Sequence, residues 1–407
     1  MEQRTVSVET LKHLEKILRI AEKDSGLRIE NGVEKAGSKP GDNYMSYVIR
    51  IKLTGIRGNK TPFEINVITK HLPGDGRNMD ILRNRDFFTN EAHVYTKIVP
   101  AMGLESVAPK CYEANANGVV MEDLCVQGYI MNERRDLLDF EHCQATVKAH
   151  ARIHARSLMF KLKNPQEFKV LVDQLKEVGF PQDDDPALGQ TISSGVSAAI
   201  ESLKSIENPD EKIREAIEFL NNEKSGAYDT IRNLIVRRDE KYDVLTHGDS
   251  WNNNIFFKHD DKGGIANVKF VDFQVVRHCS AAIDFHYFVY TSAHSSVIEE
   301  RYDELVRIYQ GALVKELKSL NASDQVLRDL SLEWFQGELR KTSMYGLFTG
   351  LWLINAIFAE DTDIPNIAAI TPDYLAGRTK VPLSIRSNKV ERAKCIAFHY
   401  CRTYRNF

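Results

Sequence analysis

The most constraining feature of the sequence is a polar loop between two apolar segments, Leu245–Phe257. The loop carries a His-x-Asp-x-x-x-x-Asn pattern. A second apolar segment, Val268–Gln274, returns after a turn rich in Asp and Gly, which is typical of a hairpin. We expect this geometry to place Asp249 on the loop and Asp272 at a strand end, with Asn254 facing the same cleft. Two carboxylates and an amide form an all-oxygen set, which suits a hard cation such as Mg²⁺.

The length and composition are those of an ordinary globular protein. The chain has 407 residues, of which 43% are hydrophobic and 27% charged, so it is long enough for two core-bearing units. Its net charge of −3 offers neither a basic surface for nucleic acid nor a polybasic membrane signal. The six cysteines form no Cys-x-x-Cys pair, which predicts reduced thiols and a cytoplasmic location.

Neither a signal sequence nor a membrane span is expected. The N-terminal segment is charged and amphipathic, unlike an apolar signal core. The most apolar stretch, residues 344–359, is shorter than the ~20 residues that a span requires and contains polar residues. We therefore predict a buried helix at this position. The composition leaves the oligomeric state open.

Strand patterns dominate the first part of the chain. Apolar periodicity predicts strands over residues 47–53 and 63–70, and helices over 8–22 and 84–99. The turn-rich loop 37–46 could fold its backbone N–H groups over phosphates, although an ordinary hairpin loop is the alternative. The chain then becomes mostly helical, which predicts a boundary between an N-terminal and a C-terminal lobe.

Two charged residues of the first part need separate interpretation. Lys70 ends the second predicted strand, and Glu91 lies on the helix that follows. Taken alone, each is compatible with an ordinary solvated side chain. Phosphoryl transfer from a nucleotide, however, requires a lysine to hold phosphates, cations to bridge them and a group that orients the attacking hydroxyl. The order Lys70, Glu91, Asp249, Asn254 and Asp272 supplies all of these parts.

A helix predicted over residues 140–160 carries two histidines four positions apart, His150 and His154. This spacing occurs in zinc proteases, but there the first histidine is followed by a glutamate that acts as the base. Ala151 occupies that position here. We therefore interpret the two histidines as packing residues.

These motifs together resemble the kinase-like phosphotransferases related to choline and aminoglycoside kinases, and within them the ecdysteroid-kinase-like (CHK-kinase-like) family. The match is carried by residues 246–254, 271–274, 121–124 and 153–155, and it spans roughly residues 30 to 360. The resemblance implies an α+β, bilobal protein-kinase-like fold. Its N-terminal antiparallel sheet lobe would comprise residues 1–121, and its larger, mainly helical catalytic lobe residues 122–407.

The resemblance also implies a role for each matching residue. Asp249 would be the catalytic aspartate, and Asn254 and Asp272 would be the Mg²⁺ ligands. Lys70 would hold the α- and β-phosphates of ATP, with Glu91 as its ion-pair partner. The remaining nucleotide contacts would come from the phosphate loop and from the hinge that reads adenine: Asn43, Ser46, Met121, Glu122, Asp123 and Leu124. His247 and Asp284 would brace the catalytic loop.

The sequence departs from related kinases at four points. The phosphate loop lacks the Gly-x-Gly-x-x-Gly pattern, and His71 follows the lysine. Gln274 replaces the glycine of Asp-Phe-Gly, which removes a residue that tolerates positive φ. An Ala-Pro-Glu motif is also absent, which favours a small-molecule substrate over a protein substrate.

We therefore predict an ATP- and Mg²⁺-dependent kinase that phosphorylates a hydroxyl on a small molecule. The resemblance suggests an ecdysteroid or another hydroxylated lipophilic compound as the acceptor, with detoxification of hydroxylated xenobiotics as an alternative role. The acceptor pocket is expected among the C-terminal helices, where Tyr345, Phe348 and Trp352 are either wall or core residues. Two other hypotheses remain: a nucleotide- or ligand-binding protein without turnover, and a metal-dependent phosphohydrolase that uses His247, Asp249 and Asp272.

Overall fold

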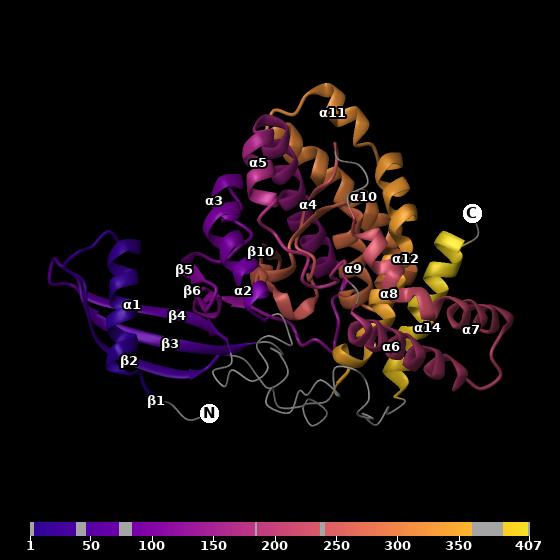
Figure 1. Cartoon of the computed structure of the whole chain (residues 1–407), viewed down its shortest axis with the longest axis horizontal. Coiled ribbons are helices and arrows are strands. Elements are labelled where there is room, and N and C mark those ends of the chain that lie inside the picture. The colour runs from indigo at the N-terminus through magenta and orange to yellow at the C-terminus, as the bar shows by residue number, and fades with distance from the viewer. Residues whose placement is uncertain are drawn as a thin grey trace. The chain divides into compact units, whose positions relative to one another are not determined.

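The structure is a computed structural model that describes residues 4–37, 46–72, 84–183, 185–236, 241–359 and 386–405. Asn43, predicted to lie in the phosphate loop, falls outside these residues. The chain forms two compact units, Met1–Ile130 and Met131–Phe407. Each unit has its own set of helices and strands (Figure 1). The chain is thus of mixed α+β composition, with an antiparallel sheet in its N-terminal part.

The first unit is built on a six-stranded antiparallel sheet in the order β1-β2-β3-β4-β6-β5. The strands are β1 (Arg4–Thr5), β2 (Arg28–Ala36), β3 (Tyr47–Ile56), β4 (Pro62–His71), β5 (Cys111–Asn115) and β6 (Gly118–Glu122). Strands β3 and β4 are the predicted strands, extended at their ends. In the register, Lys70 of β4 lies between Val48 of β3 and Val119 of β6.

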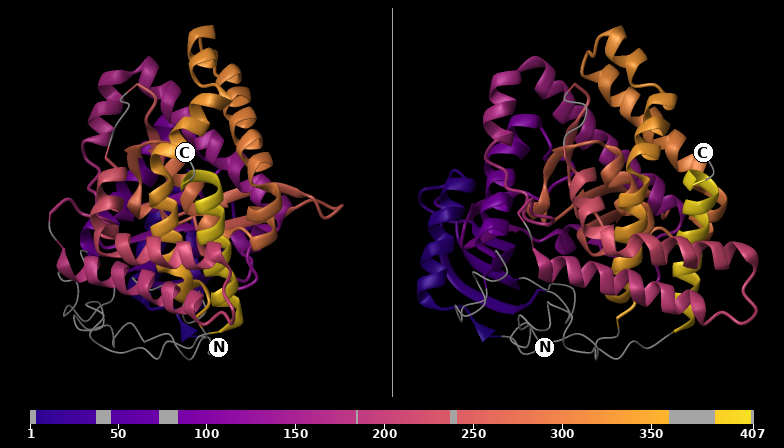
Figure 2. Two further views of the ribbon diagram at one scale, coloured as in Figure 1. Left: turned by 90° about the vertical axis from the view of Figure 1, so that its right-hand side faces the viewer. Right: turned by 45° about the vertical axis from the view of Figure 1, so that its right-hand side comes forward.

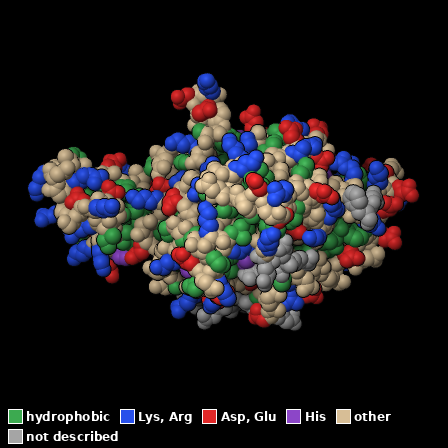
Figure 3. Space-filling model, turned by 90° about the horizontal axis from the view of Figure 1, so that it is seen from above, with side chains coloured by type: hydrophobic (Ala, Val, Ile, Leu, Met, Phe, Trp, Pro, Cys, Tyr) green, Lys and Arg blue, Asp and Glu red, His purple; other side chains and the backbone are tan. Residues whose placement is uncertain are grey.

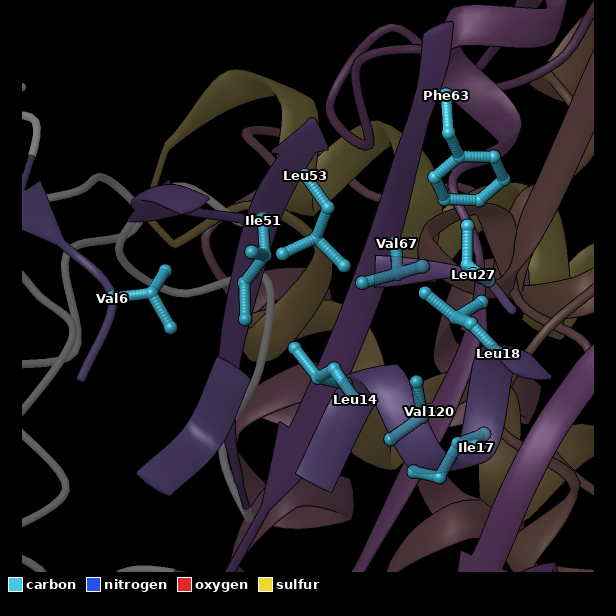
Figure 4. Close-up of a cluster of buried hydrophobic side chains, with 10 residues drawn as sticks. All are labelled: Val6, Leu14, Ile17, Leu18, Leu27, Ile51, Leu53, Phe63, Val67 and Val120. Atoms are coloured by element: carbon cyan, nitrogen blue, oxygen red, sulfur yellow. The ribbon is translucent and has the colours of Figure 1, made fainter. Parts of the chain in front are cut away.

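One helix covers this sheet with an apolar face. Helix α1 (Val8–Ala21) begins at Ser7, whose hydroxyl accepts a hydrogen bond from the N–H of Thr10. Its residues Leu14, Ile17 and Leu18 recur at helical spacing and are buried. They pack against side chains from alternate positions of the strands (Figure 4): Ile51, Leu53, Phe63, Val67 and Val120. The amphipathic helix predicted from the sequence therefore builds the core of this unit.

The remaining elements of the first unit are short. They are α2 (Asn84–His93), a π-helical turn (Val94–Ile98), α3 (Val99–Met102), a 3₁₀ turn (Leu124–Gln127) and β7 (Tyr129–Ile130). Helix α2 carries Glu91, and it packs against strands β5 and β6 of the sheet.

The second unit is mainly helical. Its helices are α4 (Phe140–Lys163), α5 (Pro165–Val172), α6 (Pro186–Lys204), α7 (Glu211–Glu223), α8 (Ala227–Leu234), α9 (Ala282–Ser292), α10 (Ser295–Ser319), α11 (Asp324–Asp329), α12 (Leu332–Ile357) and α14 (Ser387–Tyr400). Every residue of α9 is buried, and this helix packs mainly against α12. The apolar stretch 344–359 lies largely in α12 and is mostly buried, as predicted. Within the described part of the chain, no helix combines the length and apolarity that crossing a membrane requires.

Two short antiparallel ladders carry the central motif. Strand β8 (Val244–Thr246) pairs with β11 (Arg277–Cys279), and β9 (Ile255–His259) pairs with β10 (Ile265–Phe270). The β9–β10 hairpin projects from the helices (Figure 2), and charged side chains cover its tip (Figure 3). The predicted hairpin is therefore confirmed, and its base holds the polar loop in place.

Candidate active site

Lys70 and Glu91 form a buried ion pair within the first unit. Nζ of Lys70 lies 2.8 Å from Oε2 of Glu91, and the two residues are 4% and 0% exposed. The ring of Phe88, one helical turn before Glu91, lies 5.5 Å from the same ammonium group. The alternative interpretation of these residues as solvated surface side chains is therefore wrong. A charge pair buried to this extent is an unusual arrangement that functional sites often use.

The segment Met121–Leu124 leaves the sheet at the end of β6. Met121 and Leu124 are buried, whereas Glu122 is half-buried and bonds to Gln127 through its carboxylate. The carboxylate of Asp123 is buried, pairs with Arg50 and accepts the N–H of Cys125 at 3.1 Å. The Asp123 side chain therefore stabilises the turn. Contact with a nucleotide through the backbone of this segment stays a prediction.

Of the two residues predicted for the phosphate loop, only Ser46 is described. It is buried, directly before β3.

In the second unit, the catalytic loop predicted from the sequence begins immediately after β8. Gly248 adopts a φ of +83°, a conformation that glycine reaches without steric cost. The two carboxylate oxygens of Asp284, on α9, accept hydrogen bonds from the N–H groups of His247 at 2.7 Å and Gly248 at 2.8 Å. Asp284 therefore anchors the loop from α9, as the resemblance implies.

The imidazole of His247 links this loop to the strand that carries the second aspartate. Its Nδ1 accepts the N–H of Asp249 at 3.2 Å, which leaves Nε2 to donate to the carbonyl oxygen of Val271 at 3.0 Å. Burial lowers the pKa of His247 below its usual value, so the ring is neutral in this role. His247 therefore braces the loop and holds Asp249 near Asp272.

Both carboxylate oxygens of Asp249 are held by hydrogen bonds. Oδ1 accepts the hydroxyl of Tyr287 at 2.5 Å, and Oδ2 accepts Nδ2 of Asn254 at 3.0 Å. Burial and the like charge of Asp272 raise the pKa of Asp249 to about 7, against the opposing effect of the two hydrogen bonds. The two carboxylates thus repel each other at one half-buried site.

Asn254 and Asp272 are also joined through the backbone. The N–H of Val271 donates to the carbonyl oxygen of Asn254 at 3.0 Å, and Asp272 follows with a φ of +68°. Since Nδ2 of Asn254 donates to Asp249, its Oδ1 is the atom that could bind a cation. Among the described residues, no group of three or more His, Cys, Asp and Glu could hold a metal ion. A cation here would therefore rely on Asp272, the Asn254 amide and oxygens from outside the protein.

The two histidines of α4 lie beneath this loop. His154 contacts Asp284 at 3.1 Å and the hydroxyl of Tyr309 at 2.7 Å, and the ring of His150 stacks on Phe270 at 4.8 Å. Both are fully buried. Both take part in packing, as predicted, and His154 also bonds to Asp284.

Tyr287 is the residue of this site that the sequence analysis missed. Asp284 and Tyr287 are three positions apart on α9 and therefore face the same side of the helix. Asp284 reaches the backbone of the loop, and Tyr287 reaches its carboxylate. Helical spacing from Asp284 was the signal that could have indicated Tyr287.

The aromatic residues considered for the acceptor pocket belong to α12. Tyr345 and Phe348 are fully buried, and Trp352 is half-buried. Their neighbours include Phe180, whose ring centroid lies 6.3 Å from that of Tyr345 and 6.0 Å from that of Trp352. Tyr345 and Phe348 therefore serve as core residues, the second of the two roles considered.

The mixed α+β architecture, with its antiparallel sheet in the N-terminal part, is consistent with a kinase-like fold. Comparison with models of protein families identifies the family. The model of the ecdysteroid kinase-like family matches residues 40–322, more than half of the sequence, and the chain belongs to this family. No curated protein matches the chain significantly.

Proposed function

We propose that this protein is a small-molecule kinase that transfers the γ-phosphoryl group of ATP to an alcohol hydroxyl, on a bilobal kinase-like fold. The observation that carries the proposal is the half-buried carboxylate of Asp249, held at Oδ1 by Tyr287 and at Oδ2 by Asn254 beside Asp272. Phosphoryl transfer depends mainly on alignment and on stabilisation of charge, so a carboxylate held in one orientation suits it.

Asp249 acts on the acceptor side of the reaction. It accepts a hydrogen bond from the acceptor hydroxyl and takes up the proton of that hydroxyl as the oxygen bonds to the γ-phosphorus. The bond from the phosphorus to the bridging oxygen breaks, and ADP leaves with the electron pair. Each carboxylate oxygen has two lone pairs, so Oδ1 can accept the acceptor hydroxyl while it keeps Tyr287.

Asn254 and Asp272 fit Mg²⁺, because the available ligand atoms are an amide and a carboxylate oxygen. Mg²⁺ usually takes one or two protein ligands and completes its shell with phosphate oxygens and water. When bound, the ion would offset negative charge on the phosphates. The repulsion between Asp249 and Asp272 supports a cation at this position, since a positive charge would relieve it.

The first unit contributes the nucleotide site in this proposal. Lys70, held by Glu91, contacts the α- and β-phosphates, and the backbone of Met121–Leu124 reads adenine. Asn43 and Ser46 belong to the loop over the phosphates. The burial of the Lys70–Glu91 pair supports this assignment, because a buried lysine keeps its charge only when a partner compensates it.

The acceptor is a hydroxylated lipophilic small molecule, with an ecdysteroid as the first candidate on the basis of the family description. The experiment measures ADP formation with Mg-ATP and a panel of hydroxylated lipophilic compounds: steroids, plant-derived phenols and alcohols, and choline-like alcohols. We expect at least one of them to raise ADP formation well above the rate without acceptor, with a phosphate monoester as the product.

The rival hypotheses give different results in the same assay. A binding protein without turnover binds Mg-ATP but forms no ADP with any acceptor. A phosphohydrolase releases phosphate from a monoester in the absence of nucleotide. Either result, obtained with folded protein, contradicts the proposed kinase activity.

A further inference from the structure

Arg277 is a buried cation directly next to the catalytic loop. It is the first residue of β11, its backbone pairs with Thr246, and the hydroxyl of Thr246 donates to its carbonyl oxygen at 3.2 Å. The residue is 6% exposed. The backbone of Arg277 is thus fixed against Thr246. Thr246 lies two positions before Gly248, where the loop turns.

The guanidinium is oriented by Glu177, on the segment between α5 and α6. Nε and Nη2 of Arg277 donate to Oε2 and Oε1 of Glu177 at 2.7 and 3.0 Å, which is a bidentate pair. The N–H of Phe180 donates to the same Glu177 side chain at 2.9 Å. Burial lowers the pKa of Arg277, but the charge of Glu177 more than offsets this effect and keeps the arginine charged.

The third nitrogen of the guanidinium faces the loop. A Cβ atom added to Gly248 would lie 3.0 Å from Nη1 of Arg277 and 2.3 Å from the carbonyl oxygen of Val275. The Gly248 backbone and the guanidinium are therefore packed against each other with no room for a side chain. Within the described parts of the chain, Nη1 has no hydrogen-bond partner. The pairing with Glu177 therefore explains the positions of Nε and Nη2 but not why Nη1 faces the loop.

The charge of Arg277 also acts on the reacting carboxylate. Burial and Asp272 raise the pKa of Asp249, whereas Arg277 acts in the opposite direction. Arg277 also offsets part of the rise in the pKa of Tyr287, which burial and Asp249 cause. The guanidinium reaches the loop directly before this carboxylate, because its Nη1 packs against Gly248, one residue before Asp249.

We propose that Arg277 is a positioning residue for phosphoryl transfer. Its charged guanidinium packs against Gly248 and so holds the loop that presents Asp249 to the acceptor hydroxyl. The inference rests on the proposed kinase function. It assigns separate roles to the two members of one ion pair: Glu177 orients Arg277, and Arg277 acts on the loop.

The test compares variants that break the pair from either side. E177Q removes the carboxylate and leaves the guanidinium beside Gly248, whereas R277Q removes the guanidinium. Both lose the bidentate pair, so both lower the melting temperature. We expect kcat to fall about tenfold or more in R277Q and to stay within about threefold of wild type in E177Q, with KM for Mg-ATP unchanged in both.

Two further variants keep the test decisive. R277K retains the charge, and we expect its kcat to lie several-fold above that of R277Q. The double variant E177Q/R277M leaves no unpaired carboxylate at this half-buried position and should fold where R277Q does not, because breaking a pair with a buried member from one side is the costly change. We expect its kcat to be as low as that of R277Q.

Three outcomes overturn the inference. They are an equal loss of kcat in E177Q and R277Q, losses of kcat that follow the melting temperature across all four variants, and wild-type kcat in the double variant. A wild-type protein that forms no acceptor-dependent ADP contradicts the kinase function itself, and with it this role. Wild-type turnover with equal losses contradicts only the role of Arg277.

Discussion

The hydroxyl of Tyr287 donates a 2.5 Å hydrogen bond to Oδ1 of Asp249. Tyr287 comes from α9, the helix that also supplies Asp284 to the backbone of the same loop. One buried helix thus sets both the path of the loop and the orientation of its carboxylate. Hydrogen bonds to charged groups contribute about 1.5–3 kcal/mol, so this contact is large enough to affect catalysis.

Replacing Tyr287 with phenylalanine should lower kcat about tenfold, because the freed carboxylate loses one of its two side-chain hydrogen bonds and about 1.4 kcal/mol corresponds to a factor of ten. KM for Mg-ATP should stay within about twofold. Y290F is the matched control, since Tyr290 lies on the same helix and its hydroxyl contacts His399 at 2.7 Å instead. Equal kcat values for the two variants would show that the hydroxyl of Tyr287 does not contribute to catalysis.

Replacing Asp249 with asparagine should reduce phosphoryl transfer on the order of 10²-fold or more, the size of a general-base contribution. The amide keeps the shape of the side chain but cannot accept the proton of the acceptor hydroxyl. Mg-ATP binding, measured by calorimetry, should persist. D261N, on the exposed turn of the β9–β10 hairpin, is the control for loss of a carboxylate. Near-normal turnover in D249N argues against the assigned role.

Replacing Asp272 with alanine should abolish the Mg²⁺-dependent part of nucleotide binding, because Asn254 would be the only protein ligand left for the ion. The measurement is a calorimetric titration of ATP with Mg²⁺ and again with a chelator. In wild type the two isotherms should differ, and in D272A they should coincide. Mg-ATP binding in D272A that equals wild type contradicts the metal assignment.

Replacing Lys70 with methionine should weaken ATP binding and also destabilise the first unit, since Glu91 would lose its lysine partner in the interior. Breaking a buried pair from one side costs about 3–5 kcal/mol, whereas neutralising both partners costs much less. The variant K70M/E91Q should therefore recover stability in thermal melts but not ATP binding. Recovery of both would show that the lysine does not contact the nucleotide.

The buried histidines of the second unit predict destabilisation in mild acid. Burial lowers the pKa of His150 and His399 to about 3 and that of His286 to about 4. Between these values and pH 6.5 the unfolded chain binds more protons than the folded chain, so stability falls as the pH falls. At pH 5.5 each histidine accounts for about 1 kcal/mol of loss relative to neutral pH.

The variant H150F tests this prediction, because phenylalanine keeps the stack on Phe270 and cannot titrate. Its melting temperature should fall less than that of wild type between pH 7.5 and 5.5. The exposed His294, replaced by asparagine, is the control. Asp249 titrates with the opposite sign in every variant, so only the difference from wild type is diagnostic. Parallel pH curves for H150F and wild type contradict the prediction.

Local patterns predicted much of this structure. Helical spacing in residues 8–22 corresponds to α1, and the two apolar segments with an Asp- and Gly-rich turn form the β9–β10 hairpin. These elements depend on neighbours in the chain, whose side-chain period and turn chemistry can be read directly. The His-x-Asp-x-x-x-x-Asn motif likewise places Asp249 and Asn254 on one short loop, where they are hydrogen-bonded.

What the sequence alone determined is therefore the set of elements, the loop motif and the order of its charged residues. Only the tertiary structure decided that Lys70 and Glu91 are buried, that Tyr287 reaches Asp249, and that Arg277 packs against Gly248. The physical reason is that these contacts join segments far apart in the chain, and burial depends on how the sheet and helices pack. Periodicity identifies the face of an element that is covered, but not the side chain that covers it.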